Sequence, residues 1–246
     1  DRLIHEINTD PRLTWVLHAG DIKNGISVCS DRMLIDRLQR FQQFKIPFIL
    51  TPGDNEWTDC HRFFTGSYNP LERLARLRGL FYANPGNSLG QKTVTLRTQA
   101  SDPHFSEYVE NLRWRKNHVV FATVHVVGSN NGWAQFSNRT EADDMEAKRR
   151  TEAAIVWIKQ TFEEARNTDA RGVFVLFHAD LNFEYAKGSH ARLGFDGIIE
   201  VFEQESAQYL RPILLAHGDS HRFRVDKPLQ NNKKQTINHV TRVETF

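Results

Sequence analysis

The sequence predicts a protein of the α/β class, and three observations carry that prediction. Short apolar runs alternate with longer segments whose apolar residues recur at spacings of three and four, as in amphipathic helices. This alternation is typical of repeated β-α units, in which helices lie outside a mostly buried sheet. Four apolar runs also end in polar clusters, which read HAGD, TPGDNE, FHAD and AHGDSH. Because ligands of open α/β sheets gather beyond the carboxyl ends of the strands, these clusters are candidates for one shared site.

The first half of the chain is expected to hold three helices and three strands. Residues 2–8 place Leu3, Ile4 and Ile7 at helical spacing, so the chain begins inside a helix. Ser30 is the expected N-cap of a second helix. The further expected elements are strands in 13–21, 46–54 and 92–99 and helices in 30–44 and 70–80.

The second half repeats the alternation. A long helix is expected in 140–167, where Ala154, Ile158 and Phe162 share one face. A shorter helix is expected in 195–210. The expected strands are 118–133, 172–180, 212–221, 222–226 and 237–246.

Composition excludes a membrane span and does not indicate nucleic acid. The chain has 246 residues, 39% hydrophobic and 25% charged, and no apolar run is long enough to cross a bilayer. The formal net charge is +2, and the Lys and Arg residues are scattered rather than gathered in one motif. No linker divides the chain, so one large domain is expected. It starts with neither Met nor a signal peptide, which predicts that something upstream is missing.

The polar clusters contain the residue types of a divalent metal site. A single Gly-Asp after a strand is usually only a turn, and a single buried His is usually only a hydrogen-bonding residue. Here, however, Gly-Asp occurs three times, at 20–21, 53–54 and 218–219, and the candidate residues lie on four separate loops. Carboxylate, amide and imidazole groups together suit Zn, Mn or Fe, and such a site would activate water against a phosphoester. The candidate ligands are Asp21, Asn55, His178, Asp219 and His221.

In their order, the motifs resemble those of the calcineurin-like metallophosphoesterases, which include the purple acid phosphatases. That family's pattern runs Asp-x-His, Gly-Asp, Gly-Asn-His-Glu/Asp, a single His, then Gly-His-x-His. HAGDIKNG resembles the second motif, with Gly25 four residues after Asp21, and PGDNEW resembles the third. FHAD resembles the fourth and HGDSHRF the fifth. The resemblance extends from Trp15 to about Arg224, which is most of the chain.

Carried over position by position, the resemblance implies a dinuclear site. Asp21 would bridge two metals; Asn55, His178 and the residue at 219 would bind the second metal, and His221 the first. At 219 the family's His is replaced by Asp, an anionic ligand that favours oxygen-preferring ions. The neighbouring His217 is an alternative ligand at this point.

The general acid is open in the sequence. Glu56 stands, in this reading, where the family has a His that contacts phosphate or protonates the leaving group. A Glu can serve as the acid only if burial or a neighbouring carboxylate raises its pKa. His217, His61 and Asp54 are alternatives, and so is a solvated Glu56 with no catalytic role.

The family's opening Asp-x-His motif is absent. The one literal Asp-x-His, Asp102 to His104, follows the third motif and carries Pro in the middle, so it is expected to be a turn. The resemblance therefore implies a single domain, 1–246, that lacks its first strand and first metal-binding motif. The first metal would then keep only Asp21 and His221.

The fold and activity implied by the resemblance are specific. The fold is a four-layer α/β/β/α sandwich of two mixed sheets flanked by helices. The reaction is hydrolysis of a phosphate mono- or diester, a small-molecule substrate, by a metal-bound hydroxide with two divalent ions, Mn, Fe, Zn or similar. Trp57 and Asn130 lie on loops at the same edge and are candidates for substrate binding. The alternatives are a non-catalytic metal- or phosphate-binding relative and a nuclease or nucleotide phosphodiesterase.

The chain has two cysteines, Cys29 and Cys60, each just past the end of a strand that the family fold places beside the other. A disulfide between them would join two ligand-bearing loops and favours a periplasmic or secreted protein. Two free thiols in a cytoplasmic protein are the alternative, because connectivity cannot be read from sequence.

Overall fold

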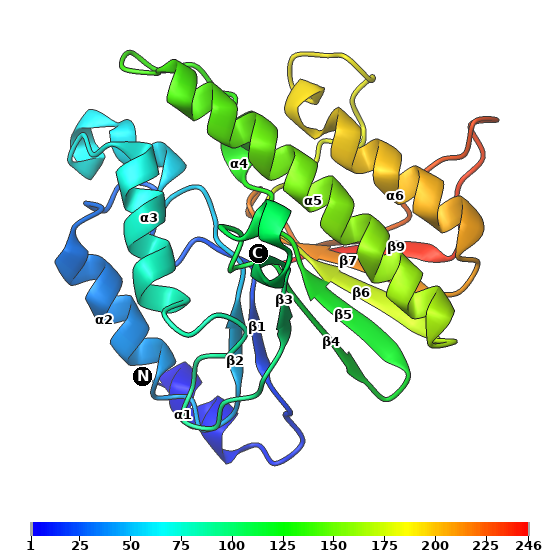
Figure 1. Cartoon of the computed structure of the whole chain (residues 1–246), viewed down its shortest axis with the longest axis horizontal. Helices are drawn as coiled ribbons and strands as arrows, with labels where there is room; N and C mark the ends of the chain where they lie inside the picture. The colour runs from blue at the N-terminus through cyan, green and yellow to red at the C-terminus, as the bar shows by residue number, and fades with distance from the viewer. Residues whose placement is uncertain (1, 246) are drawn as a thin grey trace.

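A computed structural model describes residues 2–245 and confirms the expected α/β sandwich (Figure 1). The larger sheet has seven strands in the order β3-β4-β5-β6-β7-β9-β8. Its central strands β5, β6, β7 and β9 run parallel, whereas both edges are antiparallel. The strands are β3 Arg97–Thr98, β4 Leu112–Lys116, β5 Val119–Thr123, β6 Gly172–Leu176, β7 Ile213–His217, β8 Arg224–Asp226 and β9 Val240–Glu244.

The smaller sheet consists of β1 (Val16–His18) and β2 (Phe48–Leu50), which pair in parallel. An isolated antiparallel bridge also links Phe48 to Leu89, but no third strand of this sheet forms among the described residues. β2 is fully buried, whereas the three residues of β1 are half-buried. The two sheets thus differ in size, with seven strands in one and two in the other.

Helices cover the outer faces of both sheets, as Figure 1 shows. α5 and α6 lie over the large sheet, and α2 and α3 flank the small one. The α-helices are α1 Arg2–Thr9, α2 Asp31–Phe41, α3 Pro70–Phe81, α4 Gly128–Asn131, α5 Glu141–Asn167 and α6 Asp196–Gln208. Short 3-10 turns are η1 Thr58–His61, η2 Phe63–Thr65, η3 Gln99–Ser101, η4 Pro103–Phe105 and η5 Leu193–Phe195.

Helix starts follow local capping chemistry. The Ser30 side chain accepts a hydrogen bond from the Met33 amide, which confirms the expected N-cap of α2. Thr140 and Asp143 form a capping box at the start of α5. These caps satisfy amide groups that the first helical turn leaves unpaired.

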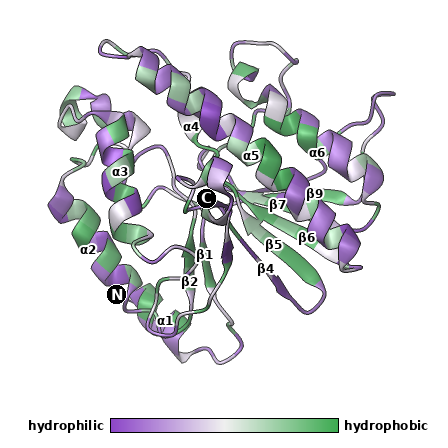
Figure 2. Cartoon of the chain, in the orientation of Figure 1, coloured by the Kyte–Doolittle hydropathy of each residue, from purple (hydrophilic) through white to green (hydrophobic). Residues whose placement is uncertain are grey.

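Each sheet has its own apolar core. One core packs α5 and α6 onto the large sheet through side chains such as Trp157, Phe162 and Phe202. The other packs α2 and α3 onto the small sheet around Phe41 and Phe48, whose rings stack with centroids 4.2 Å apart. Figure 2 shows the hydrophobic strands of the large sheet beneath helices that carry both hydrophobic and hydrophilic residues.

Three elements differ from expectation. The strand expected in 92–99 is only β3, Arg97–Thr98, because the preceding residues form bends and an isolated bridge between Asn87 and Thr95. β4 was not expected at all, since its sequence LRWRK ends in exposed charged residues that hide its two buried positions. The strand expected in 118–133 ends at Thr123.

Two further expectations are confirmed. The segment from Asp102 to His104 forms a turn, in which the Asp102 carboxylate accepts a hydrogen bond from the His104 amide at 3.0 Å. Among residues 2–245, no helix is long and apolar enough to span a membrane.

Candidate metal centre

The loops that follow β1, β2, β6 and β7 meet at one edge of the sandwich and line a cavity of about 650 Å³. All five candidate ligands predicted from the sequence lie on its wall. They are Asp21, Asn55, His178, Asp219 and His221. The sequence motifs therefore do converge in space, at the carboxyl ends of the strands.

Gly20 and Gly53 allow the loops after β1 and β2 to cross with their backbones in direct contact. A Cβ on Gly20 would lie 2.5 Å from the Gly53 nitrogen, and a Cβ on Gly53 would lie 2.3 Å from the Asp21 nitrogen. Real Cβ atoms do not approach backbone so closely, so both positions require glycine. The crossing brings the Asp21 and Asp54 carboxylates to the same point.

His178 is the centre of the cluster. Its Nε2 lies 3.4 Å from Asp21 Oδ1, 3.5 Å from Asp54 Oδ1 and 3.9 Å from Asp219 Oδ1. Its Nδ1 lies 2.7 Å from the Ala19 carbonyl oxygen, which can only accept, so Nδ1 donates its hydrogen there. We call His178, Asp21, Asp54 and Asp219 the metal-facing cluster.

Electrostatics show that this cluster holds excess negative charge. Burial lowers the pKa of His178, but the nearby carboxylates of Asp54, Asp21 and Asp219 outweigh it and raise the pKa to about 10. Burial raises the pKa of Asp21 to about 6, against the opposing effect of His178. Burial likewise raises the pKa of Asp219. A positive charge placed among these groups would be stabilised.

The donor set fits a divalent cation. Asp21, Asp54 and His178 each offer one ligand atom, and these atoms lie within 4.8 Å of one another. His178 Nε2 is buried and has no hydrogen-bond partner. The Ala19 carbonyl holds the ring so that Nε2 faces the carboxylates, an arrangement common in metal-binding histidines. Oxygen and imidazole ligands together suit Zn, Mn or Fe.

The structure changes the reading of TPGDNEW. Counted from Gly53, the family pattern Gly-Asn-His-Glu/Asp sets Asp54 at the Asn position, Asn55 at the His position and Glu56 at the acidic position. The geometry favours this register, because the Asp54 carboxylate faces His178. Asn55 is instead a donor: its Nδ2 hydrogen-bonds Asp21 Oδ2 at 2.6 Å. Sequence reasoning thus missed Asp54, although counting from Gly53 could have found it.

Glu56 lies behind the loop and does not line the cavity. It is fully buried, and its Oε1 accepts a hydrogen bond from the Gly53 amide at 2.6 Å. Burial and the Asp21 charge raise its pKa to about 8. The expectation that Glu56 faces substrate as an acid is therefore not supported; the residue braces the turn that aims Asp54.

His217 also lies away from the cavity, in the core. Its ring is fully buried and stacks on Phe177 with centroids 5.4 Å apart. Asp219, not His217, turns toward the cluster: its Oδ2 accepts a hydrogen bond from the Asp180 amide at 3.1 Å. Neither a metal-binding nor a catalytic position for His217 fits this packing.

The two candidate substrate residues lie outside the cavity wall. Trp57 is buried beneath Arg150, whose guanidinium carbon lies 5.2 Å from the ring centroid. The Asn130 side-chain oxygen accepts a hydrogen bond from the Gly194 amide at 2.9 Å. The Asn130 oxygen is thus already paired with a neighbouring loop, and the Trp57 ring is covered by Arg150 of α5.

His18 and Lys23 line the cavity but were not singled out in the sequence. His18 ends β1, three residues before Asp21, and its ring packs against Phe41 and Phe48. Lys23 is 4% exposed and its Nζ donates to the Asn24 carbonyl. Both residues lie within three positions of Asp21, and this closeness to the Gly-Asp motif could have identified them from the sequence.

Cys29 and Cys60 form a disulfide, as expected, across a sequence separation of 31 residues. Both are fully buried. The bond joins the segment after Asp21 to the segment after Asp54, so it ties together two loops of the metal-facing cluster.

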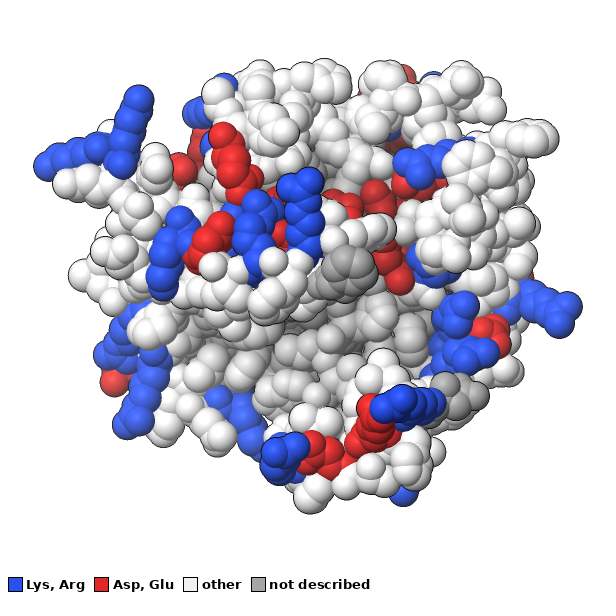
Figure 3. Space-filling model, turned by 180° about the vertical axis from the view of Figure 1, so that it is seen from behind, with Lys and Arg blue, Asp and Glu red and all other residues white. Residues whose placement is uncertain are grey.

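On the face seen in Figure 3, Lys and Arg side chains are interspersed with Asp and Glu, with no continuous basic area.

A family model described as calcineurin-like phosphoesterase matches residues 1–223. No curated protein matches the sequence.

Proposed function

This chain belongs to the calcineurin-like phosphoesterase family, and from that premise we propose that it hydrolyses a phosphate mono- or diester with the help of divalent cations. The strongest support is the environment of His178. A buried imidazole nitrogen without a hydrogen-bond partner faces three carboxylates within 3.9 Å. Such a group of like charges is costly to bury unless a cation joins it.

We assign one cation to Asp21, Asp54, His178 and Asp219. Asp21 would also help to hold a second cation, together with His221, which lines the same cavity. Bound divalent ions, Mn, Fe or Zn, would polarise a phosphoryl oxygen and supply hydroxide near neutral pH.

The chain's own residues orient the reactants. The Ala19 carbonyl fixes the His178 ring. Asn55 holds Asp21 through its amide and lies on the cavity wall, where the same amide can face a substrate oxygen. The substrate phosphate thus meets oriented donors that need no rearrangement, which favours the transition state.

Hydrolysis of an aryl phosphate tests the proposal. With Mn²⁺ the protein should hydrolyse the substrate, and EDTA should abolish turnover. Asp21→Asn should lower kcat/KM by at least about 100-fold, because it removes a charge that both cations would share. The matched control is His104→Ala in the literal Asp-x-His segment, an exposed side chain whose loss should change nothing.

Other outcomes would favour the alternatives. Tight Mn²⁺ binding without turnover would favour a metal- or phosphate-binding relative. Cleavage of dinucleotides but not of aryl phosphates would favour a nucleotide phosphodiesterase.

We also infer a periplasmic or secreted location from the buried Cys29–Cys60 disulfide, since such bonds persist in oxidising compartments. Cell fractionation checks this: recovery in the cytoplasm with reduced thiols would contradict it.

A further inference from the structure

The loop after β5 holds three consecutive non-glycine residues in the left-handed region. Ser129, Asn130 and Asn131 have φ values of 52°, 55° and 53°. A left-handed residue costs about 1–2 kcal/mol when it carries a side chain. Consecutive residues of this kind persist only where the surroundings hold them, and such places are often functional.

Two side-chain contacts hold this turn from outside. Arg150, on α5, donates to Asn131 Oδ1 at 2.5 Å and to the Asn131 carbonyl at 3.0 Å. Asn130 Oδ1 accepts from the Gly194 amide at 2.9 Å. Both asparagines are thereby fixed, and Ser129 between Gly128 and Asn130 has a defined position.

The turn packs directly behind Asp54. A Cβ on Gly128 would lie 2.3 Å from Asp54 Oδ2, so the backbone there leaves no room for a side chain. Ser129 Oγ lies 3.4 Å from the same Oδ2. The other carboxylate oxygen, Oδ1, faces His178. One oxygen of Asp54 therefore points to the metal-facing cluster and the other to the turn.

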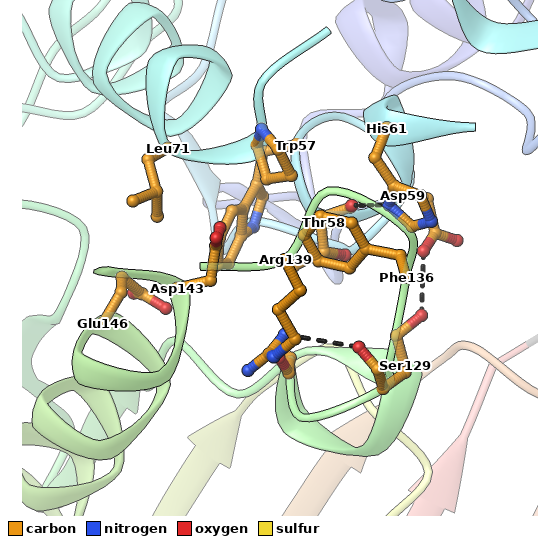
Figure 4. Close-up of a pocket in the computed structure, with 13 residues that line it drawn as sticks. Trp57, Thr58, Asp59, His61, Leu71, Ser129, Phe136, Arg139, Asp143 and Glu146 are labelled. Atoms are coloured by element: carbon orange, nitrogen blue, oxygen red, sulfur yellow. Dashed lines mark hydrogen bonds between the residues drawn. The ribbon is translucent and has the colours of Figure 1, made fainter. Parts of the chain in front are cut away.

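The Ser129 side chain is held in place by a hydrogen bond to the buried Asp59 carboxylate. Its hydroxyl donates to Asp59 Oδ1 at 2.8 Å, and Asp59 Oδ2 pairs with Arg62 at 2.7 Å. Asp59 is 3% exposed. Figure 4 shows Ser129 and Asp59 facing each other, with the hydrogen bond between them, beside the stacked His61 and Phe136. The single hydroxyl hydrogen of Ser129 rotates, so from one place it can donate either to Asp59 or to Asp54, one at a time.

We propose that Ser129 is a positioning residue for the metal site, held by Asp59 and Arg62, which fixes the outer oxygen of Asp54 so that the inner oxygen faces the cation. The inference rests on the proposed function, because it needs a cation in the metal-facing cluster. Groups that orient a metal ligand typically change metal affinity about 10–100-fold when removed.

Calorimetric titration of the metal-free protein with Mn²⁺ tests this role. Ser129→Ala and Ser129→Gly should both weaken Mn²⁺ binding about 10–100-fold. Gly tolerates the left-handed backbone, so agreement between the two variants assigns the loss to the hydroxyl rather than to strain. The control is Ser137→Ala, an exposed serine on the same loop, which should bind Mn²⁺ like the wild type.

A second comparison separates positioning from loss of structure. In an Asp54→Asn background, Ser129→Ala should weaken Mn²⁺ binding by less than about 3-fold, since the ligand through which it acts has changed. Full additivity of the two losses would overturn the proposal, and so would unchanged affinity in Ser129→Ala. If the wild type binds no Mn²⁺, the proposed function itself fails, and this inference with it.

Discussion

Two buried clusters of histidine and carboxylate have opposite electrostatics. In the metal-facing cluster, His178 lies among three aspartates, and no Lys or Arg within residues 2–245 forms an ion pair with any of them. In the second cluster, His125 hydrogen-bonds Glu110 at 2.7 Å, and Arg78 pairs with the same carboxylate at 2.6 Å. We call His125, Glu110 and Arg78 the arginine-paired cluster.

The arginine explains the contrast. Burial alone would raise the pKa of Glu110, but Arg78 and His125 outweigh it and lower the pKa to about 2. Burial lowers the pKa of His125, against the opposing effect of Glu110. In the metal-facing cluster the pKa values of His178 and Asp21 rise instead, to about 10 and about 6.

The comparison shows how to tell a structural cluster from a functional one. A buried carboxylate with a permanent cation is satisfied within the fold. A group of carboxylates whose only ion-pair partner among the described residues is a histidine is suited to an external cation. Residue types alone are similar in the two clusters, so the arginine is the discriminating feature.

The largest expected effect separates the two histidines. His178→Ala should weaken Mn²⁺ binding by more than about 100-fold, because a direct ligand matters more than the groups that orient it. His125→Ala should leave the affinity within about 3-fold, since its cluster already holds a cation. Calorimetric titration of both variants with Mn²⁺ measures these affinities. An equal loss of affinity in the two variants would contradict the distinction between the clusters.

The next effect concerns stability. Arg78→Met keeps the aliphatic stem but leaves Glu110 buried without its cation, which should lower the free energy of unfolding by about 3–5 kcal/mol. Urea unfolding measures this, and Mn²⁺ affinity should not change. A variant as stable as the wild type would show that Arg78 is not needed to balance Glu110.

The smallest effect is a pH dependence. A folded pKa of about 2 for Glu110, below its usual 4.5, means that the unfolded chain binds the proton more readily. Its contribution, about 3 kcal/mol, is fully present above pH 4.5 and is lost as the pH falls toward 2. Glu110→Gln should flatten the acid side of the stability curve measured by urea unfolding in EDTA.

Asp21 gives the opposite sign in the same experiment. Its folded pKa is raised to about 6, so its contribution is present below about pH 4 and is lost as the pH rises through 6. Asp21→Asn should therefore make the metal-free protein more stable at neutral pH. Identical curves for the Asp21 and Glu110 variants would contradict the comparison.

Much of the fold was readable from local patterns. Helices α2, α3, α5 and α6 follow apolar spacing, and Ser30 caps α2 as its residue type predicts. β4 was not predicted, because its exposed arginine and lysine masked the two buried positions that pair it with β5. Strand pairing is a long-range interaction, and a sequence window does not contain the partner.

For the metal site too, some features were predictable from the sequence and others were not. The ordered motifs identified the family, which the family match confirms, and predicted that Asp21, His178 and Asp219 share one edge. They did not distinguish Asp54 from Asn55 or show that Glu56 is buried. Adjacent residues of a tight turn point in different directions, and the direction of each depends on what the turn packs against.

The sequence by itself determined the α/β class, the family, the loops that carry the ligands and the residues that cap the helices. Each of these follows from residue types and spacings within one short segment. Only the tertiary structure decided which carboxylate faces His178, since the crossing of Gly20 and Gly53 and the turn at Ser129 set the direction of Asp54. The burial of a side chain and its pairing with an opposite charge depend on segments that are far apart in the chain. These two properties determine which carboxylates are left without an internal partner and are available to bind a cation.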